Sequence, residues 1–488
     1  MNRQYLKDDY QSVIRSRSSR VSQDFALRSA KPLAIPQELA IPQPITKNER
    51  SIEEHTFLKR GHVLSFGALF LFTVVLYARP AEFYPSSITN SLALIVGVVT
   101  LATFAATQIA LEGTLTARPA EVNLVLLFML TAALSIPLAI DPLIAWQEFS
   151  GTFIRAVLVF IVIVNVVRTE ARLKVLLSVS IVTAVLLSIG AINEYRLGLM
   201  TIEGYRAGGR GTGLFGNTND MALHLVTMLP LSVAFFFGSR GPLRKTTHAI
   251  CAALMIFAIV LSYSRGAFLG VLVAFVFFAF KIGRRSKIEI AAVVLIAAVG
   301  MILVAPSGYG NRLLSIFIPE LDPNGSADSR RGELLRSTYV ALRHPFLGIG
   351  MANYQPNMSN RGLVTHNSYT QVASEMGLIA LTLYTMFIVK PLRKLSAIAR
   401  QTFGVKEDSH FYYLALGLQA SLLVYMVSSF FLSVPYVWNV YYLVGYAVCF
   451  RRIYESETGN IVTIEKRQKQ NAEPASVASS EPAVVACT

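Results

Sequence analysis

The chain has 488 residues, of which 53% are hydrophobic and 15% are charged, and its mean hydropathy is +0.50. Water-soluble proteins are less apolar and carry more charge, so these values exclude a soluble enzyme or nucleic-acid-binding protein and predict an all-α polytopic membrane protein. The net charge of +15 then reflects orientation in the membrane and anionic lipid headgroups, and no nucleic-acid partner is expected.

The predicted elements begin with a polar tail. Residues 1–61 are basic and contain several prolines, which predicts a disordered cytoplasmic tail, and residues 453–488 predict a second one. Residues 62–452 should form the transmembrane domain. Twelve apolar runs in it are long enough, or nearly so, to cross a bilayer. They cover residues 63–78, 88–107, 122–140, 152–167, 173–192, 218–237, 246–263, 266–280, 287–304, 370–389, 411–432 and 434–450.

The basic residues between these runs test the count. With both termini in the cytoplasm, the connections after the fourth, sixth, eighth and tenth runs are rich in Lys and Arg, as the positive-inside rule requires, and neutral or acidic turns such as 141–151 fall between them. All thirteen Lys then lie on the cytoplasmic side, whereas the twelve basic residues of the outer side are all Arg. A guanidinium group makes planar, bidentate contacts with phosphate oxygens that an ammonium group cannot make. The outer arginines as a set therefore favour an anionic, phosphorylated ligand, although any single one could equally snorkel or pair with a carboxylate.

The first candidate segment, residues 204–220, lies between the fifth and sixth runs and contains six glycines with Arg206 and Arg210. A GxGxxG pattern occurs in it, but no strand precedes the pattern, so a dinucleotide site is not expected. A glycine-rich turn can point backbone N–H groups at an anion, and we expect an anion-binding turn here; a tight re-entrant turn is the alternative. Asn217 then begins a polar helix face that must contact protein or water.

The second candidate is Arg265, which interrupts a nearly continuous apolar stretch from 246 to 280. An arginine at the membrane edge can snorkel, so this signal is weak by itself.

The third candidate lies in the long outer connection, residues 305–365. Asp328 or Ser329 can cap a helix there, and Pro345 ends it. The apolar side of this helix should lie on the membrane surface or against the bundle. Its members are Leu334, Leu335, Tyr339 and Leu342.

The fourth candidate is His366, which begins a transmembrane helix at the outer interface. Its imidazole has a reference pKa of about 6.5 and can accept a proton near neutral pH. Asn367, Gln371 and Glu375 follow at intervals of four residues and form a polar stripe that descends into the membrane. On spacing alone, a histidine at a helix start is more often a cap or an interface residue than a catalytic one.

Taken in order, the four segments resemble the O-antigen ligase and polymerase superfamily of bacterial envelope glycosyltransferases. No single segment is specific for the family, but the four segments in this order on the expected outer side form a specific pattern. The pattern extends over residues 205–380. The pieces are Arg210-x-x-Gly213-x-Phe215-x-Asn217-x-Asn219, then Ser264-Arg265-Gly266, then Ser329-Arg330 with His344-Pro345-x-x-Gly348-x-Gly350, and finally His366-Asn367 with nine residues before Gly377.

The resemblance implies a C-type glycosyltransferase-like fold of about twelve transmembrane helices, in the bacterial inner membrane, with a periplasmic active site. It implies transfer or polymerisation of a glycan carried on undecaprenyl pyrophosphate, with no metal or other cofactor. The acceptor would be a hydroxyl of another glycan, of lipid A core or of a protein, with a flippase and a chain-length regulator as possible partners. The implied catalytic residues are His366, Arg210 and Arg265. The implied substrate-binding residues are Arg206, Arg330, Arg331, Asn217, Asn219, Asn367 and Glu375.

Two departures from the family pattern bear on the subtype. Ala380 stands where a ligase is expected to have Gly, Thr or Tyr, which favours a polymerase over a ligase. Leu334 or Leu335 replaces the usual aromatic residue, so either Arg330 or Arg331 can be the family arginine. A twelve-span transporter or lipid-linked glycan flippase is the alternative function, and a non-catalytic assembly partner is a third. Transporters commonly consist of two similar halves with a site near the midplane, whereas here the polar residues gather at one interface.

Overall fold

The computed structural model describes residues 61–200, 205–208, 215–282, 310, 314, 325–405 and 409–462. The chain divides into two units, Met1–Glu54 and His55–Thr488, and every described residue belongs to the second. The expected amino-terminal tail, the apolar run 287–304 and most of the carboxyl-terminal tail lie outside the described residues.

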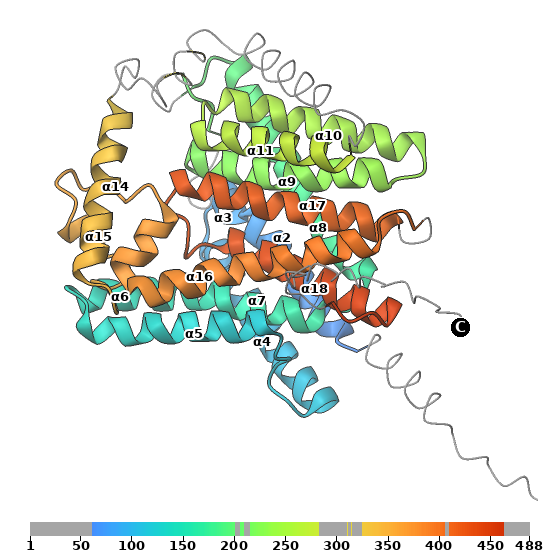
Figure 1. Cartoon of the computed structure of the whole chain (residues 1–488), viewed down its shortest axis with the longest axis horizontal. Helices are drawn as coiled ribbons and strands as arrows, with labels where there is room; N and C mark the ends of the chain where they lie inside the picture. The colour runs from blue at the N-terminus through green and yellow to red at the C-terminus, as the bar shows by residue number, and fades with distance from the viewer. Residues whose placement is uncertain are drawn as a thin grey trace, which may run out of the picture. The chain divides into compact units, whose positions relative to one another are not determined.

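The structure confirms a multi-pass helical membrane protein. Within the described ranges there is no strand, and ten helical segments are long and apolar enough to cross a membrane, each coinciding with a predicted run. Figure 1 shows most of the long helices running side by side, with α14 lying across their left-hand ends. The helices are α2 (Val63–Ala78), α3 (Pro80–Phe83), α4 (Ser87–Glu112), α5 (Ala120–Ser135), α6 (Pro142–Glu148), α7 (Ile154–Val166), α8 (Glu170–Arg196), α9 (Thr218–Gly238), α10 (Pro242–Leu261), α11 (Arg265–Ile282), α14 (Ser326–Arg343), α15 (Tyr354–Asn357), α16 (Ser368–Gln401), α17 (Ser409–Ser428) and α18 (Trp438–Thr458).

Three boundaries differ from the sequence-based expectation. The expected turn at 141–151 is helical, because Asp141 caps α6 through two backbone N–H groups, Pro142 occupies its first position, and the helix continues through a π-helical turn into α7. The run 434–450 forms α18, which is too polar to count among the ten spans. This helix extends through Thr458, beyond residue 452 where the tail was expected to begin, because Ile453 and Tyr454 are buried.

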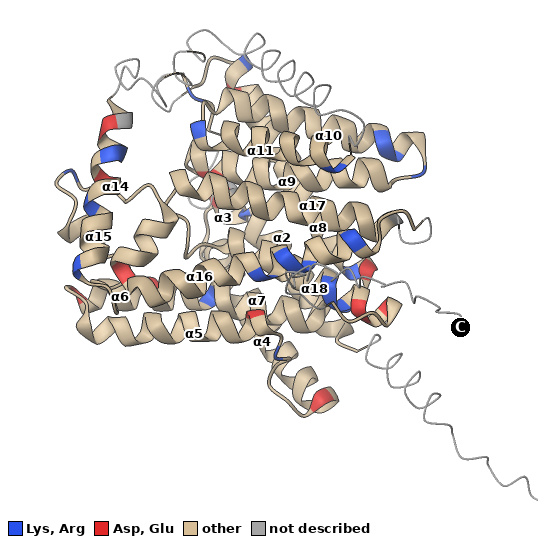
Figure 2. Cartoon of the chain, in the orientation of Figure 1, with Lys and Arg blue, Asp and Glu red and all other residues tan. Residues whose placement is uncertain are grey.

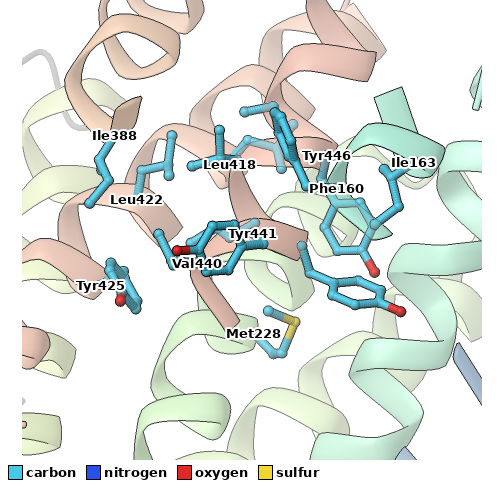
Figure 3. Close-up of a cluster of buried hydrophobic side chains, with 14 of the residues drawn as sticks. Phe160, Ile163, Met228, Ile388, Leu418, Leu422, Tyr425, Val440, Tyr441 and Tyr446 are labelled. Atoms are coloured by element: carbon cyan, nitrogen blue, oxygen red, sulfur yellow. The ribbon is translucent and has the colours of Figure 1, made fainter. Parts of the chain in front are cut away.

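Helix α18 lies in the centre of the packed core. Figure 3 shows Val440, Tyr441 and Tyr446 of α18 surrounded by buried side chains from α7, α9, α16 and α17. Lipid tails are as apolar as leucine, so close packing and internal hydrogen bonds, more than burial from water, hold such helices together. The tyrosine hydroxyls show this, since Tyr446 lies 3.0 Å from the Ser180 hydroxyl and Tyr441 donates to the Pro435 carbonyl at 3.0 Å.

Charged side chains gather mainly at the two ends of the helices, as Figure 2 shows. At one end, which we call the lysine-bearing end, the fully buried Glu121 carboxylate accepts from Lys394 at 2.9 Å and from Arg451 at 3.3 Å. Arg168 pairs with Glu112 at the same end. These pairs join α5 to α16 and α18, and α4 to the connection between α7 and α8. The opposite end carries the candidate functional residues.

Candidate functional site

The segments 205–208 and 262–265 contact each other. Arg206 is buried and donates from Nε to the Ser262 carbonyl at 2.9 Å and from Nη2 to Asn219 Oδ1 at 2.8 Å. The Ala207 N–H donates to the Leu261 carbonyl at 3.1 Å. Because Ser262 is three residues before Arg265, these bonds bring both arginines to the turn between α10 and α11. Arg210, the most prominent arginine of the glycine-rich segment, lies outside the described residues.

Helix α14 joins this turn through its first residue. Arg265 Nη2 donates to the Ser326 hydroxyl at 3.1 Å. The helix starts at Ser326, with Gly325 as its N-cap at φ 59°, so the expected capping by Asp328 or Ser329 is wrong. A glycine can adopt this left-handed conformation without strain, which lets the helix begin earlier than the cap-forming side chains indicate.

The buried side of α14 combines polar and apolar residues, since Val340 and Ala341 are buried together with Glu333 and Ser337. Glu333 and Ser337 are buried against α16, where the Ser337 hydroxyl donates to Thr370 Oγ1 at 2.9 Å. The expected apolar side faces away from the bundle, since Leu335, Tyr339 and Leu342 are each at least 60% exposed. This outward direction agrees with contact to a membrane surface and not with packing against the helices.

His366 faces the buried side of α14. The Arg330 guanidinium and the Glu333 carboxylate both act on its imidazole electrostatically. Burial, followed by the positive charge of Arg330, lowers the pKa of His366 to about 4, so the side chain is neutral at pH 7. Arg330 and Glu333 are three residues apart on one helix face, whereas Arg331 is exposed on an adjacent face. The structure therefore brings Arg330, and not Arg331, to the histidine.

His366 has a backbone φ of 52°, in the left-handed region that favours glycine. Holding a histidine there costs about 1–3 kcal/mol, and such strain is found at functional sites whose surroundings enforce it. The surroundings here are the neighbouring hydroxyls: Thr365 Oγ1 lies 2.9 Å from Ser433 Oγ, and the Ser368 hydroxyl donates to the Leu432 carbonyl at 2.7 Å. In the described part of the chain, the imidazole makes no hydrogen bond that would occupy it.

The contacts close into a ring. Residues 428–433, which anchor Thr365, also touch the residue after Arg265: Ser428 donates to the Gly266 carbonyl at 3.0 Å, and a side chain at Gly266 would meet the Phe431 Cβ at 3.0 Å. The ring therefore runs from Arg265 through α14 to His366 and returns through residues 428–433. Arg265, Arg330 and His366 consequently lie around one site at one end of the helices, and Arg206 adjoins it.

Residues 345–350 hold α14 to α16 by close backbone contact. A side chain at Gly348 would overlap the Glu375 backbone, and a side chain at Gly377 would overlap the Phe346 carbonyl. Gly377 has φ 87° and ψ 174°, which interrupts α16 and frees its backbone for pairing. Three backbone hydrogen bonds result: Leu378 N–H to the Pro345 carbonyl at 2.7 Å, Ile349 N–H to the Ser374 carbonyl at 3.0 Å, and Gly350 N–H to the Glu375 carbonyl at 2.8 Å.

The Glu375 carboxylate is buried and accepts three hydrogen bonds from described residues. It accepts from the Tyr436 hydroxyl at 2.9 Å, from Gln371 Nε2 at 3.3 Å and from the Tyr354 N–H at 3.4 Å. Burial and the charge of Glu375 raise the pKa of Tyr436, which keeps its hydroxyl a donor. Glu375 therefore joins α16 to the segment that contains Tyr354, and its expected role in substrate binding stays a prediction.

The remaining predicted residues have local structural partners. Asn217 is exposed and caps α9, while Asn219 orients Arg206. Asn367 is buried and caps α16, its Oδ1 accepting from the N–H groups of Tyr369 and Thr370 at 2.9 and 3.0 Å. Asn367 Nδ2 is buried and has no hydrogen-bond partner among the residues that the structure describes, and Asn367 directly follows His366.

Sequence reasoning missed Glu333 as a site residue. Its carboxylate accepts from the Tyr354 hydroxyl at 2.7 Å and from the Ser359 hydroxyl at 2.9 Å. Burial and Glu333 together raise the pKa of Tyr354. The signal was present as the three-residue interval to Arg330. Within the described ranges, no three His, Cys, Asp or Glu side chains are grouped so as to hold a metal ion.

A comparison with protein families matches residues 250–385 to the family described as O-antigen ligase. No curated protein matches the chain. The matched range contains the turn with Arg265, helix α14 and the start of α16 with His366, but it excludes the glycine-rich segment around Arg206 and Arg210. The resemblance drawn from the four motifs is thus confirmed where three of them lie, and residues 250–385 of this membrane protein are an O-antigen ligase domain.

Proposed function

We propose that the protein is an inner-membrane glycosyltransferase that transfers or polymerises oligosaccharide carried on undecaprenyl pyrophosphate at the periplasmic side. The ring of contacts around Arg265, Arg330 and His366 carries the proposal, because it gathers two guanidinium groups and a neutral imidazole at one end of the helices. The family match over residues 250–385 supports it independently.

In the proposed reaction, an acceptor hydroxyl attacks the sugar carbon that is bonded to the diphosphate. The carbon–oxygen bond to the diphosphate breaks, a bond to the acceptor oxygen forms, and the polyprenyl diphosphate leaves as an anion. Arg265 and Arg330 stabilise that developing charge, and Arg210 is proposed to do the same. His366 accepts the proton of the acceptor hydroxyl.

The low pKa of His366 fits this order of events. A neutral imidazole is ready to accept a proton, and a diphosphate bound beside it stabilises the imidazolium form and raises its pKa. The histidine thus becomes a stronger base when the donor is bound. Before the donor binds, its imidazole stays neutral and is not protonated by solvent at pH 7.

Ala380 supports one subtype of this function. This residue is buried within α16, away from solvent, and replaces the larger or more flexible residues expected of a ligase. We propose a polymerase, in which the acceptor is another lipid-linked chain rather than lipid A core or a protein.

The test uses purified protein in lipid nanodiscs with undecaprenyl-pyrophosphate-linked repeat units, with and without lipid A core. His366→Ala and Arg265→Ala should each lower kcat/KM by about 10²-fold or more, since removal of one charge-stabilising donor costs about 3 kcal/mol. Longer lipid-linked glycan without core would identify a polymerase, and glycan attached to core a ligase.

Arg330 and Arg331 form a matched pair for the control. Arg330→Ala should abolish most transfer, and Arg331→Ala should leave it near the wild-type rate, because of these two arginines Arg330 is the one that acts on His366. Arg330→Lys keeps the charge but loses the bidentate geometry, and should recover only part of the rate. Full transfer by His366→Ala and Arg330→Ala would contradict the proposed function.

A further inference from the structure

Glu333 on α14 is a buried carboxylate on the side of the helix that faces His366. One contact fixes this arrangement, since the Ser337 hydroxyl donates to Thr370 Oγ1 at 2.9 Å. Ser337 comes one turn after Glu333 on the same face of α14. Thr370 comes four residues after His366, so the carboxylate and the imidazole both lie next to this contact. Among the described residues, Arg330 and Glu333 are the charged groups that act on the imidazole.

Two hydroxyl groups hold the Glu333 carboxylate in place. The Tyr354 hydroxyl donates to Oε2 at 2.7 Å and the Ser359 hydroxyl donates to Oε1 at 2.9 Å, so both oxygens accept a hydrogen bond. Hydrogen bonds to an ionised acceptor are stronger than those between neutral groups, and they restrict the side chain to one orientation. Tyr354 is 1% exposed, so its hydroxyl acts on the carboxylate and not on a bound substrate.

The same carboxylate organises the segment that leads to His366. While it donates to Glu333, the Ser359 hydroxyl accepts a hydrogen bond from the Leu363 N–H at 2.9 Å. Arg336, three residues further along α14, donates from Nη1 to the carbonyl directly before Ser359 at 3.1 Å. The chain before the histidine is therefore attached to α14 through side chains, and Glu333 holds the hydroxyl around which this segment turns.

A fixed carboxylate beside a histidine favours proton transfer to that histidine. An imidazole that accepts a proton becomes a cation, and a negative group stabilises the cation relative to the neutral form. In the proposed reaction this cation forms next to Arg330, whose positive charge has the opposite effect. Glu333 is the described group that offsets this repulsion, because it acts on the same ring from one turn further along the helix.

We propose that Glu333 is a positioning residue of the site, which holds the segment before His366 in place and stabilises the protonated imidazole during transfer. The assignment rests on the proposed function, because it requires His366 to accept the proton of the acceptor hydroxyl. The proton moves from the acceptor oxygen to the imidazole, and it does not move on to Glu333, since both carboxylate oxygens already accept hydrogen bonds. Glu333 is 5% exposed, so it acts through the histidine and not on the glycan.

Four variants separate the charge of Glu333 from its place in the hydrogen-bond network. Glu333→Gln removes the charge and nearly preserves the shape of the side chain. Asp328→Asn is the matched control, because Asp328 is an exposed acidic residue on the same helix. Glu333→Asp keeps the charge on a shorter side chain, and Tyr354→Phe keeps the charge but removes the donor to Oε2.

The measurement is the pH dependence of kcat and KM for glycan transfer by the full chain in nanodiscs. Glu333→Gln should lower kcat at pH 7 by about tenfold or more with little change in KM, since proton transfer and not donor binding is affected. It should also move the acid limb of kcat to lower pH, because a charge that raises the pKa of His366 is lost. Glu333→Asp should recover part of the rate and restore the limb, and Asp328→Asn should match the wild type.

A wild-type kcat in Glu333→Gln would overturn the assignment. A slow Glu333→Gln whose acid limb is unmoved, and whose rate Glu333→Asp does not recover, would also overturn it, because the residue would then be purely structural.

Tyr354→Phe carries the test if thermal unfolding shows that Glu333→Gln does not fold. It should lower kcat severalfold with the acid limb in place, and an unchanged kcat would count against the assignment. The proposed function fails separately. Full transfer by His366→Ala would contradict the enzyme, whereas loss of transfer in His366→Ala with a normal Glu333→Gln would remove this inference alone.

Discussion

Gly377→Ala is the substitution by which the architecture of the site can be tested most directly. Gly377 interrupts α16 at φ 87° and ψ 174°, a conformation in which a side chain is strained. Its hydrogen atom faces the Phe346 carbonyl, where a methyl group would overlap. The substitution should separate residues 345–350 from α16 while leaving His366 and the arginines chemically intact.

The magnitude follows from two contributions. The backbone conformation costs alanine about 1–3 kcal/mol relative to glycine. Moving residues 345–350 away breaks three backbone hydrogen bonds worth about 1 kcal/mol each. Docking of this segment should therefore weaken by about 4–6 kcal/mol. Because α14 directly precedes the segment, Arg330 should leave His366, and kcat/KM should fall about 10²-fold or more.

Two assays and one control decide the outcome. Glycan transfer reports the site, and limited trypsin digestion after Arg343 reports release of the segment. Gly332→Ala on α14 is the control, because a methyl group there meets nothing and alanine stabilises a helix by about 0.5–1 kcal/mol over glycine. If Gly377→Ala transferred glycan and resisted trypsin like the wild type, backbone docking would not position the arginine, and the reasoning would be refuted.

Two further predictions concern charge. The acid limb of kcat/KM should lie well below pH 6.5, near 4, because the neutral His366 is the active form and its pKa is lowered; Arg330→Gln should move the limb to higher pH by removing a lowering charge. A limb at about pH 6.5 in both proteins would contradict a buried catalytic histidine. At the lysine-bearing end, Glu121→Ala should destabilise the fold by about 3–5 kcal/mol, because Lys394 would lose its carboxylate partner and the buried Arg451 would keep only Glu455. Thermal unfolding in detergent measures this loss, and an unchanged midpoint would show that the pairs contribute little.

The position of α14 across the helix ends explains why polar residues form part of its buried side. In a soluble protein, an amphipathic helix hides its apolar side. Here Glu333 and Ser337 face the site and α16, whereas Leu335 and Tyr339 face outward at an end of a membrane bundle. The environment at that position relaxes the usual rule, because a membrane surface can receive the exposed apolar residues.

The amino-acid sequence by itself determined the helical membrane class, ten of the spans, and the identity of the motifs around Arg265, Arg330 and His366. These features depend on length, hydropathy and local order, which are written along one chain segment. The end of α14 was also predictable, because Pro345 stops a helix by local sterics.

Only the tertiary structure decided which of two adjacent arginines meets the histidine and that Glu375 supports the loop. Both outcomes depend on the rotation of α14 and α16 about their axes, which is set by distant partners such as Tyr436. The side chains of neighbouring residues on a helix point in directions about a quarter turn apart. If the predicted buried face is wrong by one residue, a different side chain is assigned to the site. The local sequence determines that a segment is helical, but packing against other helices determines which face of that helix points into the site.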